Sequence, residues 1–575
     1  MNTKVPKHFN SGLTPWLRGL LALVFGLSVN LCFEPFNLGF LAWFALIPAQ
    51  LLVIQRRDRG VFWIGSLFGF GYFSGSFWFL NHIFPGCGFL VALIWATQPG
   101  IWLWLMSKLR HQLTFPDPLK EVANAKISQK FLDLKKSLLL SLASACLWAT
   151  LEWSRSWLFT GLPWNGLEVS QIYNLAILKN VSFLGPTGLC FLITFMNTSI
   201  AVALEQILLI SKSQKLIPQA IYPKPVRFVI LPISAVLLLI TSTLVSDKLK
   251  AENQADSNLR VALIQGNFDP YYQGLNQEQY AFHMNTYRKL SMQALEQNPD
   301  LLFWPETPLP SSWHYDVNFP NLVKQISSSR NTPMIFGTGF REVDPLDPSK
   351  NYHFNSALAT NSDGQVTTRY DKIHTVPYGE FMPFRYLMSE SLYTKVDKLR
   401  GMGTSLSSGR IHQVFDLPQK SRIGVNICFD DIFSDTSRGF ALNGANILST
   451  ITNDSWFHQS AGGAQHTAQS VLRAVETGLP LIRCGNTSES MVILPDGSIP
   501  HILLNPKDQS RFSRGHLIAD VPFTIDPNPT FYLKHPFLSP SILSLISFLI
   551  LFYLLLQYMK RKKIFLQKAL NNSES

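Results

Sequence analysis

Three short stretches in the second half of the chain carry residues that together suit acyl transfer. Glu306 ends an apolar run in FWPETPLP, Lys372 lies in RYDKIHTVPYGEF, and Cys428 follows the strand-like run RIGVNI. A thiol with an ordinary pKa of about 8.5 is mostly protonated at neutral pH, and a nearby ammonium favours the thiolate. A carboxylate within hydrogen-bond reach can accept the proton during attack. The same lysine, with a backbone N–H, can stabilise the tetrahedral oxyanion.

Each of these residues has a simpler interpretation when it is taken alone. Cys428 suits a buried core thiol, and Glu306 and Lys372 suit solvated surface charges. Only the combination argues for chemistry, with Glu380 eight residues after Lys372 as a second carboxylate. The six cysteines show no regular spacing, no CxxC and no cluster with histidine, so the sequence predicts no disulfide framework, no metal and no cofactor.

Short strands alternate with helical stretches from Leu259 onward, which predicts an α/β domain over residues 247–535. Ile423, Val425 and Ile427 alternate with Gly424 and Asn426, as in a half-buried strand. A nucleophile directly after such a strand is held rigidly and remains exposed. The remaining expected strands are 260–266, 301–306, 333–340, 353–360, 366–373, 445–451, 479–485 and 490–499, and the expected helices are 276–297, 318–330 and 463–478.

The rest of the chain is rich in apolar runs. Hydrophobic residues make up 47% of the sequence, with 14 Trp and 42 Phe, which is high for a soluble protein. Each run approaches the roughly 20 residues that cross a bilayer as a helix. We therefore expect seven transmembrane helices within 1–246 and an eighth, followed by a basic tail, within 536–575. The eight runs are 16–33, 38–54, 61–80, 88–107, 137–153, 182–208, 228–245 and 536–558.

The net charge of +12 does not indicate nucleic acid, because the excess lies beside the apolar runs. Residues 247–535 hold 25 Lys+Arg against 28 Asp+Glu. The segments that connect the runs fall into two sets that alternate along the chain. One set holds 22 Lys+Arg, and the short segments of the other set hold only Arg155 and Lys179. Basic connections stay in the cytoplasm, so both termini are expected inside and residues 247–535 outside. The first run reads as an uncleaved anchor.

One connection between apolar runs is rich in tryptophan. The segment EWSRSWLFTGLPW carries Trp153, Trp157 and Trp164 together with Arg155. Such residues are typical of an interfacial belt that faces lipid headgroups, and simple anchoring is the alternative.

Glu306, Lys372 and Cys428, in this order and in these contexts, resemble the Glu–Lys–Cys triad of the nitrilase (carbon–nitrogen hydrolase) superfamily. A nitrilase-like domain after seven spans and before an eighth resembles the apolipoprotein N-acyltransferase family. Further matches are QGN at 265–267, VPYGEF at 376–381, NDSWF at 453–457 and FTGLPW at 159–164. The resemblance implies an αββα sandwich whose active site faces the outer surface of the bacterial inner membrane.

The resemblance also implies a role for each residue. Glu306 would be the general base, Lys372 the oxyanion stabiliser, Cys428 the nucleophile and Glu380 a supporting carboxylate. Cys428 would take an acyl chain from a phospholipid as a thioester, and the α-amine of a diacylglyceryl-cysteine at a lipoprotein N-terminus would accept it. We expect a monomer in membrane lipid. Apolar loops at 268–275 and 384–408 are candidates to cover the site, and ordinary surface loops are the alternative.

Three stretches depart from the family's pattern. Phe429-Asp430 stands where Tyr-Glu is usual, Tyr271 and Tyr272 lie near the place of a Lys-Trp pair, and GNTSES at 485–490 replaces an Asn-Asn-Gly stretch. None of these departures touches the triad, so they bear on substrate preference.

Two other functions are consistent with part of the sequence. A membrane-tethered amidase acting on a small C–N substrate would use the same triad but gives no reason for eight spans. A transporter or scaffold with a degenerate nitrilase-like domain would not need the intact triad, and most of the spans lack charged residues.

Overall fold

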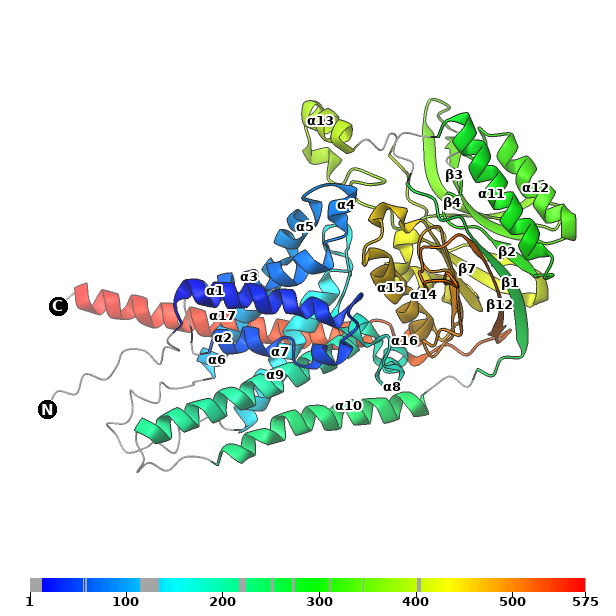
Figure 1. The fold of residues 1–575 in the computed structure, drawn as a ribbon. Coiled ribbons are helices and arrows are strands. Elements are labelled where there is room, and N and C mark those ends of the chain that lie inside the picture. The colour runs from blue at the N-terminus through cyan, green and yellow to red at the C-terminus, as the bar shows by residue number, and fades with distance from the viewer. Residues whose placement is uncertain are drawn as a thin grey trace.

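The structure, a computed structural model, has a bundle of helices on one side and an α/β domain on the other (Figure 1). The C-terminal end of the last helix lies at the end of the bundle away from the α/β domain. The residues that the structure describes are 13–54, 56, 59–113, 134–216, 224–249, 253–270, 275–309, 312–344, 346–400 and 405–573.

The α/β domain contains two six-stranded sheets. The first has the order β12-β1-β2-β3-β4-β5 and the second the order β11-β10-β9-β8-β7-β6. The strands of the first sheet are β1 (Ser257–Gln265), β2 (Leu301–Phe303), β3 (Met334–Val343), β4 (Asn351–Thr360), β5 (Val366–Asp371) and β12 (Gly515–Phe523). Those of the second are β6 (Val414–Asp416), β7 (Arg422–Ile427), β8 (Ile447–Thr452), β9 (Leu481–Gly485), β10 (Met491–Ile493) and β11 (His501–Ile502).

Helices cover the outer face of each sheet. The helices α11 and α12 lie against the first sheet, and α14 and α15 lie against the second. A further helix, α13, lies apart from both sheets (Figure 1). The helices are α11 (Gln277–Leu295), α12 (Asn318–Arg330), α13 (Glu390–Arg400), α14 (Ser434–Leu442) and α15 (Gly462–Thr477). The expected loops over the site, 268–275 and 384–408, are described only in part, because 271–274 and 401–404 lie outside the described residues.

The side chains of β1 show how the layers are held together. Leu259, Val261 and Leu263 are buried in the apolar core shared with the second sheet, whereas Ala262 and Ile264 are buried against α11 and α12. Successive residues of a strand point to opposite faces, so a strand covered on both sides is apolar throughout. The domain is therefore an αββα sandwich, as the family resemblance implies.

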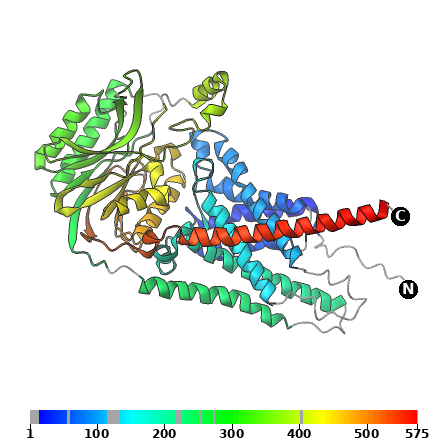
Figure 2. The same cartoon turned by 180° about the vertical axis from the view of Figure 1, so that it is seen from behind.

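The membrane-facing part consists of helices of unequal length. Six helical stretches of the described chain are long and apolar enough to cross a membrane: Pro15–Cys32, Cys87–Gln112, Leu134–Ser154, Val181–Ser211, Pro225–Lys248 and Leu538–Lys560. They correspond to all or most of the helices α1 (Pro15–Ser28), α5 (Cys87–Trp95), α6 (Thr97–Gln112), α7 (Leu134–Ser154), α9 (Val181–Leu216), α10 (Ile230–Lys248) and α17 (Leu538–Ser573). From behind, α10 and α17 extend along the bundle from the α/β domain (Figure 2).

The two other predicted spans form shorter helices. Residues 61–80 correspond to α3 (Gly60–Ser76) and the single turn α4 (Leu80–Ile83). Residues 38–54 form a 3₁₀ turn and the six-residue α2 (Ile47–Leu52), which has Pro48 in its first turn. Proline has no N–H to donate to the preceding turn, so one helix cannot run through this position unbroken. The structure thus supports six spans by length and composition, against eight expected.

Helix α15 lies between the α/β domain and the bundle. All sixteen of its residues are buried, because one side contacts β9 and the other contacts α9 and the short helix α16 (Phe531–Lys534). Its polar side chains therefore need partners within the protein.

Candidate active site

Cys428 is the first residue after β7 and begins the 3₁₀ helix η10 (Cys428–Ile432). Ile423, Val425 and Ile427 are fully buried, so the strand is rigid up to the cysteine. The φ angle of Cys428 is 49°, a left-handed conformation that costs a non-glycine residue about 1–3 kcal/mol. The chain turns sharply here, and Cys428, a partly buried residue, lies at the end of the strand, where the sequence predicts it.

Asp430 stabilises the turn that carries the cysteine. Its Oδ1 accepts a hydrogen bond from the backbone N–H of His374 at 2.7 Å, and its Oδ2 accepts from the Tyr370 hydroxyl at 2.8 Å and from the N–H of Ile427 at 3.2 Å. Burial raises the pKa of Asp430 to about 6. Asp430 has a shorter side chain than the glutamate of the family's Tyr-Glu pair, and its carboxylate stabilises the turn through these hydrogen bonds.

Glu306 lies three residues after β2 and is buried. Its Oε1 accepts from the Asn355 amide at 2.7 Å, and its Oε2 accepts from the backbone N–H of Asn453 at 2.9 Å. A Cβ at Gly337 would lie 2.7 Å from the Glu306 Cα, so β3 approaches this closely only because the residue there is glycine. Burial raises the pKa of the Glu306 carboxyl, which makes the carboxylate a stronger base.

Lys372 directly follows β5, and its side chain is 1% exposed. Its Nζ lies 2.9 Å from Glu380 Oε1 and 3.6 Å from Glu306 Oε1. Burial by itself lowers the pKa of the ammonium, but the carboxylates of Glu380 and Glu306 raise it more, so the pKa is above its ordinary value. The structure thus brings Glu306, Lys372 and Glu380 together as a buried group in which the lysine remains a cation.

The charges of this group act on the thiol of Cys428 in opposite directions. Burial and the Glu306 carboxylate raise the pKa of the thiol, and the Lys372 ammonium lowers it, with a net value well above the ordinary one. The expected effect of the lysine is therefore present but is outweighed. Because the resting residue is a thiol, a base has to take its proton as the sulfur attacks, and Glu306 is the carboxylate whose charge acts on it most strongly.

Asn355 belongs to this group and was not singled out from the sequence. It lies on β4, and its Nδ2 donates to Glu306 Oε1 at 2.7 Å and to Glu380 Oε1 at 3.0 Å. Its backbone oxygen accepts from the N–H of Lys372 at 2.9 Å. The only signal in the sequence is a polar residue within the strand-like run HFNSALAT, which is too common to identify a site.

The site lies on the face of the α/β domain that contacts the helical bundle. The ring of Phe79, just before α4, lies 4.8 Å from that of Trp164 and 4.6 Å from that of Phe457. Trp164 Nε1 donates to Gln465 Oε1 at 2.9 Å, and Gln465 Nε2 donates to the backbone oxygen of Glu34 at 3.0 Å. Segments from the membrane part therefore reach the start of α15, next to the nucleophile turn.

The tryptophan-rich connection only partly fits an interfacial belt. The side chain of Trp157 is 55% exposed, but Trp164 is 2% exposed and Arg155 is fully buried. Arg155 forms an ion pair with Glu152 and donates to the backbone oxygens of Leu162 and Trp164. The belt interpretation is therefore wrong for Arg155 and Trp164, which stabilise the protein interior instead of facing headgroups.

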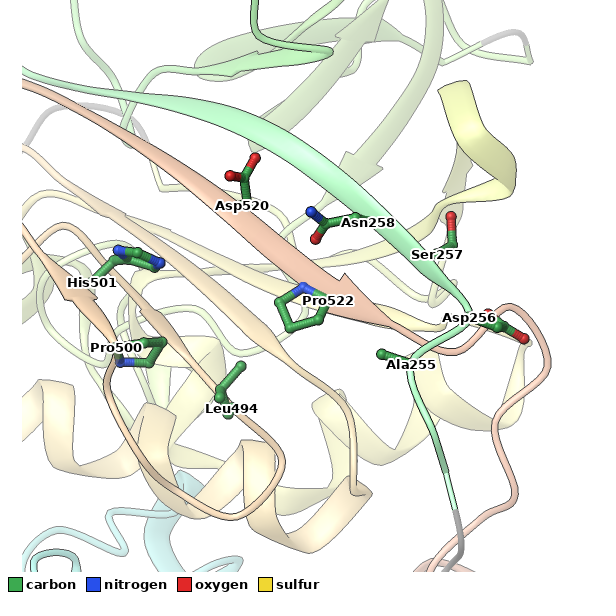
Figure 3. Close-up of a pocket in the computed structure, with 9 residues that line it drawn as sticks. All are labelled: Ala255, Asp256, Ser257, Asn258, Leu494, Pro500, His501, Asp520 and Pro522. Atoms are coloured by element: carbon green, nitrogen blue, oxygen red, sulfur yellow. The ribbon is translucent and has the colours of Figure 1, made fainter.

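A surface pocket of about 670 Å³ lies elsewhere in the domain, between β1, β12 and the segment around Pro500 (Figure 3). Its lining residues are Ala255, Asp256, Ser257, Asn258, Leu494, Pro500, His501, Asp520 and Pro522. None of them is a candidate site residue, and the carboxylate of Asp520 is already paired with Arg260. This pocket therefore contains none of the candidate catalytic groups.

Two family descriptions match the chain. Residues 25–199 match the apolipoprotein N-acyltransferase N-terminal domain, and residues 260–523 match the carbon–nitrogen hydrolase domain, which includes Glu306, Lys372, Glu380 and Cys428. The two matches correspond to the helical bundle and to the α/β domain.

Relatives named apolipoprotein N-acyltransferase match most of the chain. One from Geobacter metallireducens is 31% identical over 488 residues, which is 84% of this chain and 86% of the relative. Others from Allorhizobium ampelinum and Rhodopseudomonas palustris are 27% and 28% identical, over 84% of this chain and 86% and 87% of the relatives. At this identity and coverage, and with both domains matched, the chain belongs to the apolipoprotein N-acyltransferase family.

Proposed function

We propose that this protein transfers an acyl chain from a phospholipid, through a thioester on Cys428, to the α-amine of the N-terminal diacylglyceryl-cysteine of a lipoprotein. The observation that carries the proposal is the buried group of Glu306, Lys372 and Glu380, whose charges act on a thiol beside the membrane helices. Relatives that cover most of the chain carry the matching name.

In the first half-reaction the sulfur of Cys428 attacks the ester carbonyl carbon of the phospholipid, and Glu306 takes the thiol proton. The tetrahedral oxyanion is stabilised by the Lys372 ammonium and by a backbone N–H after the cysteine. The bond from the carbonyl carbon to the glycerol oxygen then breaks, and that oxygen takes the proton from Glu306. The products are a lysophospholipid and the acyl thioester.

In the second half-reaction the neutral α-amine of the lipoprotein attacks the thioester carbon. Glu306 accepts a proton from the nitrogen, the carbon–sulfur bond breaks, and the sulfur recovers a proton from Glu306. An amide forms and the thiol of Cys428 is restored. Glu380 supports both halves by keeping Lys372 in place and charged, through the 2.9 Å contact to its Nζ.

The proposed domain boundaries follow this chemistry. Residues 1–246 would form seven passes, 247–535 the catalytic domain on the periplasmic side, and 536–575 an eighth pass with a basic cytoplasmic tail. In support, every second connection between the expected passes reaches the α/β domain. Glu34, Phe79 and Trp164, which lie in or beside these connections, all contact that domain. The helix α3 and the broken segment 38–54 would then be the two shorter passes. Both termini would be cytoplasmic, and the chain would act as a monomer.

The test uses the full-length protein and a phospholipid labelled in its acyl chain. We expect the label to become bound to the protein and to be released by neutral hydroxylamine, which cleaves thioesters. Addition of a synthetic diacylglyceryl-cysteine lipopeptide should move the label to its amine. Release of ammonia from small amides, without protein-bound label, would instead support the amidase alternative.

Asn355 provides a prediction about the carboxylates. Asn355→Leu removes the amide that donates to Glu306 and Glu380 while keeping a similar volume. A hydrogen bond to a charged group is worth about 1.5–3 kcal/mol, so kcat for acyl transfer should fall about 10- to 100-fold. The matched control is Asn351→Leu at the exposed start of β4, which should react as the unchanged protein does. A variant at position 355 with unchanged kcat would remove Asn355 from the site.

A further inference from the structure

Four ionisable side chains form a closed ring behind Cys428. His466 Nδ1 lies 2.8 Å from Asp454 Oδ1, and its Nε2 lies 2.9 Å from Asp431 Oδ1. Arg483 joins the same carboxylates from the other side, with Nη1 3.0 Å from Asp431 Oδ2 and Nη2 2.9 Å from Asp454 Oδ2. Each of these side chains is at most 1% exposed. We call these four residues the buried charge ring.

The buried charge ring contacts the nucleophile turn at two points. Asp431 is part of η10, three residues after Cys428, and the Nε2 of His466 also donates to the backbone oxygen of Cys428 at 3.2 Å. Arg473 on α15 donates to the backbone oxygen of Asp431 at 3.2 Å. A left-handed cysteine persists only if its surroundings enforce that conformation, and these contacts restrain the turn on both sides.

His466 is held as a cation. Burial by itself lowers the pKa of its imidazole, but the carboxylates of Asp454 and Asp431 raise it more, and with Arg483 opposing them the pKa is about 9. Both ring nitrogens are engaged, so His466 offers neither a lone pair to a metal nor a base to the thiol. With two cations and two carboxylates, the ring is neutral overall.

The ring also lies close to the reacting sulfur. The sulfur of Cys428, one carboxylate oxygen of Asp454 and one ring nitrogen of His466 lie within 4.8 Å of one another. The negative charge of Asp454 raises the pKa of the thiol. A positive charge on His466 offsets this effect, so loss of that charge would leave a net negative ring beside a sulfur that has to become an anion during attack.

We propose that His466 is a positioning residue for acyl transfer, whose imidazolium holds the backbone of Cys428 in its turn and balances the charges of Asp431 and Asp454 beside the sulfur. The proposal rests on the role of Cys428 as the nucleophile. His466 acts through the cysteine and not on the lipid, so its loss should lower kcat and leave KM nearly unchanged.

The readout is the rate at which iodoacetamide alkylates Cys428 at a series of pH values, measured by mass spectrometry of the Cys428 peptide from the full-length protein in detergent. The charged groups around the thiol are Glu306, Lys372, Asp454 and His466, with Arg483 behind them. His466→Gln gives the ring a charge of −1, so the profile should shift to higher pH. A shift of one pH unit makes alkylation about ten-fold slower at pH values below the pKa.

Two further variants should shift the pH profile of alkylation in the opposite direction and cancel the shift, respectively. Asp431→Asn gives the ring a charge of +1, so the profile should move to lower pH. His466→Gln combined with Asp431→Asn restores neutrality, so the profile should return close to that of the unchanged protein. The matched control is His501→Gln, an exposed histidine on β11 in the pocket of Figure 3, which should have no effect.

A histidine with only a structural role would lower the yield of folded protein without this ordered set of shifts. Unshifted profiles in His466→Gln and Asp431→Asn would overturn the proposal, and so would a double variant shifted as far as His466→Gln. If His466→Gln does not fold, the pH profiles of Asp431→Asn and of the double variant still test the proposal. Alkylation needs no lipid, so a failure of the unchanged protein to accept label from phospholipid would reject the proposed function without affecting this readout.

Discussion

Cys428→Ala is expected to abolish both the protein-bound label and the transfer of acyl chains to a lipopeptide. Without the sulfur no thioester can form, and the remaining carboxylates and lysine have no covalent intermediate to act on. Removal of an enzyme nucleophile typically costs at least about 10⁴-fold in rate. The measurement is hydroxylamine-sensitive label on the purified protein, followed by mass spectrometry of the lipopeptide.

The matched control is Cys484→Ala. Cys484 lies on β9, is fully buried, and points its sulfur at the backbone oxygens of Ile264 and Phe303, at 3.6 and 3.7 Å. This variant loses packing in the core, so its stability should fall while its label per folded molecule stays the same. Acylation that continued in Cys428→Ala would refute the thioester mechanism.

Lys372→Met is expected to lose both activity and stability. The lysine is the oxyanion donor of the proposed mechanism, and loss of one such donor typically lowers kcat by about 10²- to 10³-fold. It is also the cation between Glu306 and Glu380, at 3.6 and 2.9 Å. Removal of one partner from a buried ionic group costs about 3–5 kcal/mol, which thermal or denaturant unfolding would detect.

The stability loss in Lys372→Met should depend on pH. Without the ammonium, the buried carboxylate of Glu306 faces that of Glu380 with no cation between them, so the pKa of Glu306 in the folded variant lies above that in the unfolded chain. The folded variant then binds more protons than the unfolded chain, and its stability rises as the pH falls. The free energy of unfolding of the variant should therefore approach that of the unchanged protein at acidic pH.

Two further variants distinguish the effect of the buried charges on stability from the role of Lys372 in acyl transfer. Lys372→Met combined with Glu380→Gln removes one carboxylate with the cation, so stability should recover at neutral pH while acyl transfer stays lost. Lys350→Met removes a lysine that is 66% exposed and pairs with Asp347 at the surface, so it should change neither property. If Lys372→Met kept its rate, the ammonium would not be the oxyanion donor.

Local patterns predicted much of the α/β domain. The helix expected at 276–297 is α11, which begins with a capping box between Asn276 and Gln279, and the strand before Cys428 is β7. Alternation along a strand and capping at a helix start depend on residues a few positions apart, so the sequence displays them directly. Glu306, Lys372 and Cys428 became candidates through the combination of their residue types and local motifs, and in the structure each lies just after a strand.

The partners of these residues could not be predicted in the same way. Asn355 contacts Glu306 across 49 positions of the chain, and Arg483 contacts Asp431 across 52. Neither side chain differs in type from many surface residues. The contacts arise only after two sheets and α15 have packed together, which the local sequence does not specify.

By itself, the sequence determined the apolar runs and the α/β alternation, because both depend on short-range periodicity, and it offered Glu306, Lys372 and Cys428 as candidates through their residue types and local motifs. Only the tertiary structure decided that Arg155 and Trp164 are buried and that a neutral ring of four charges lies behind Cys428. The energy of a buried charge depends on which distant groups surround it, and chain folding alone brings those groups together.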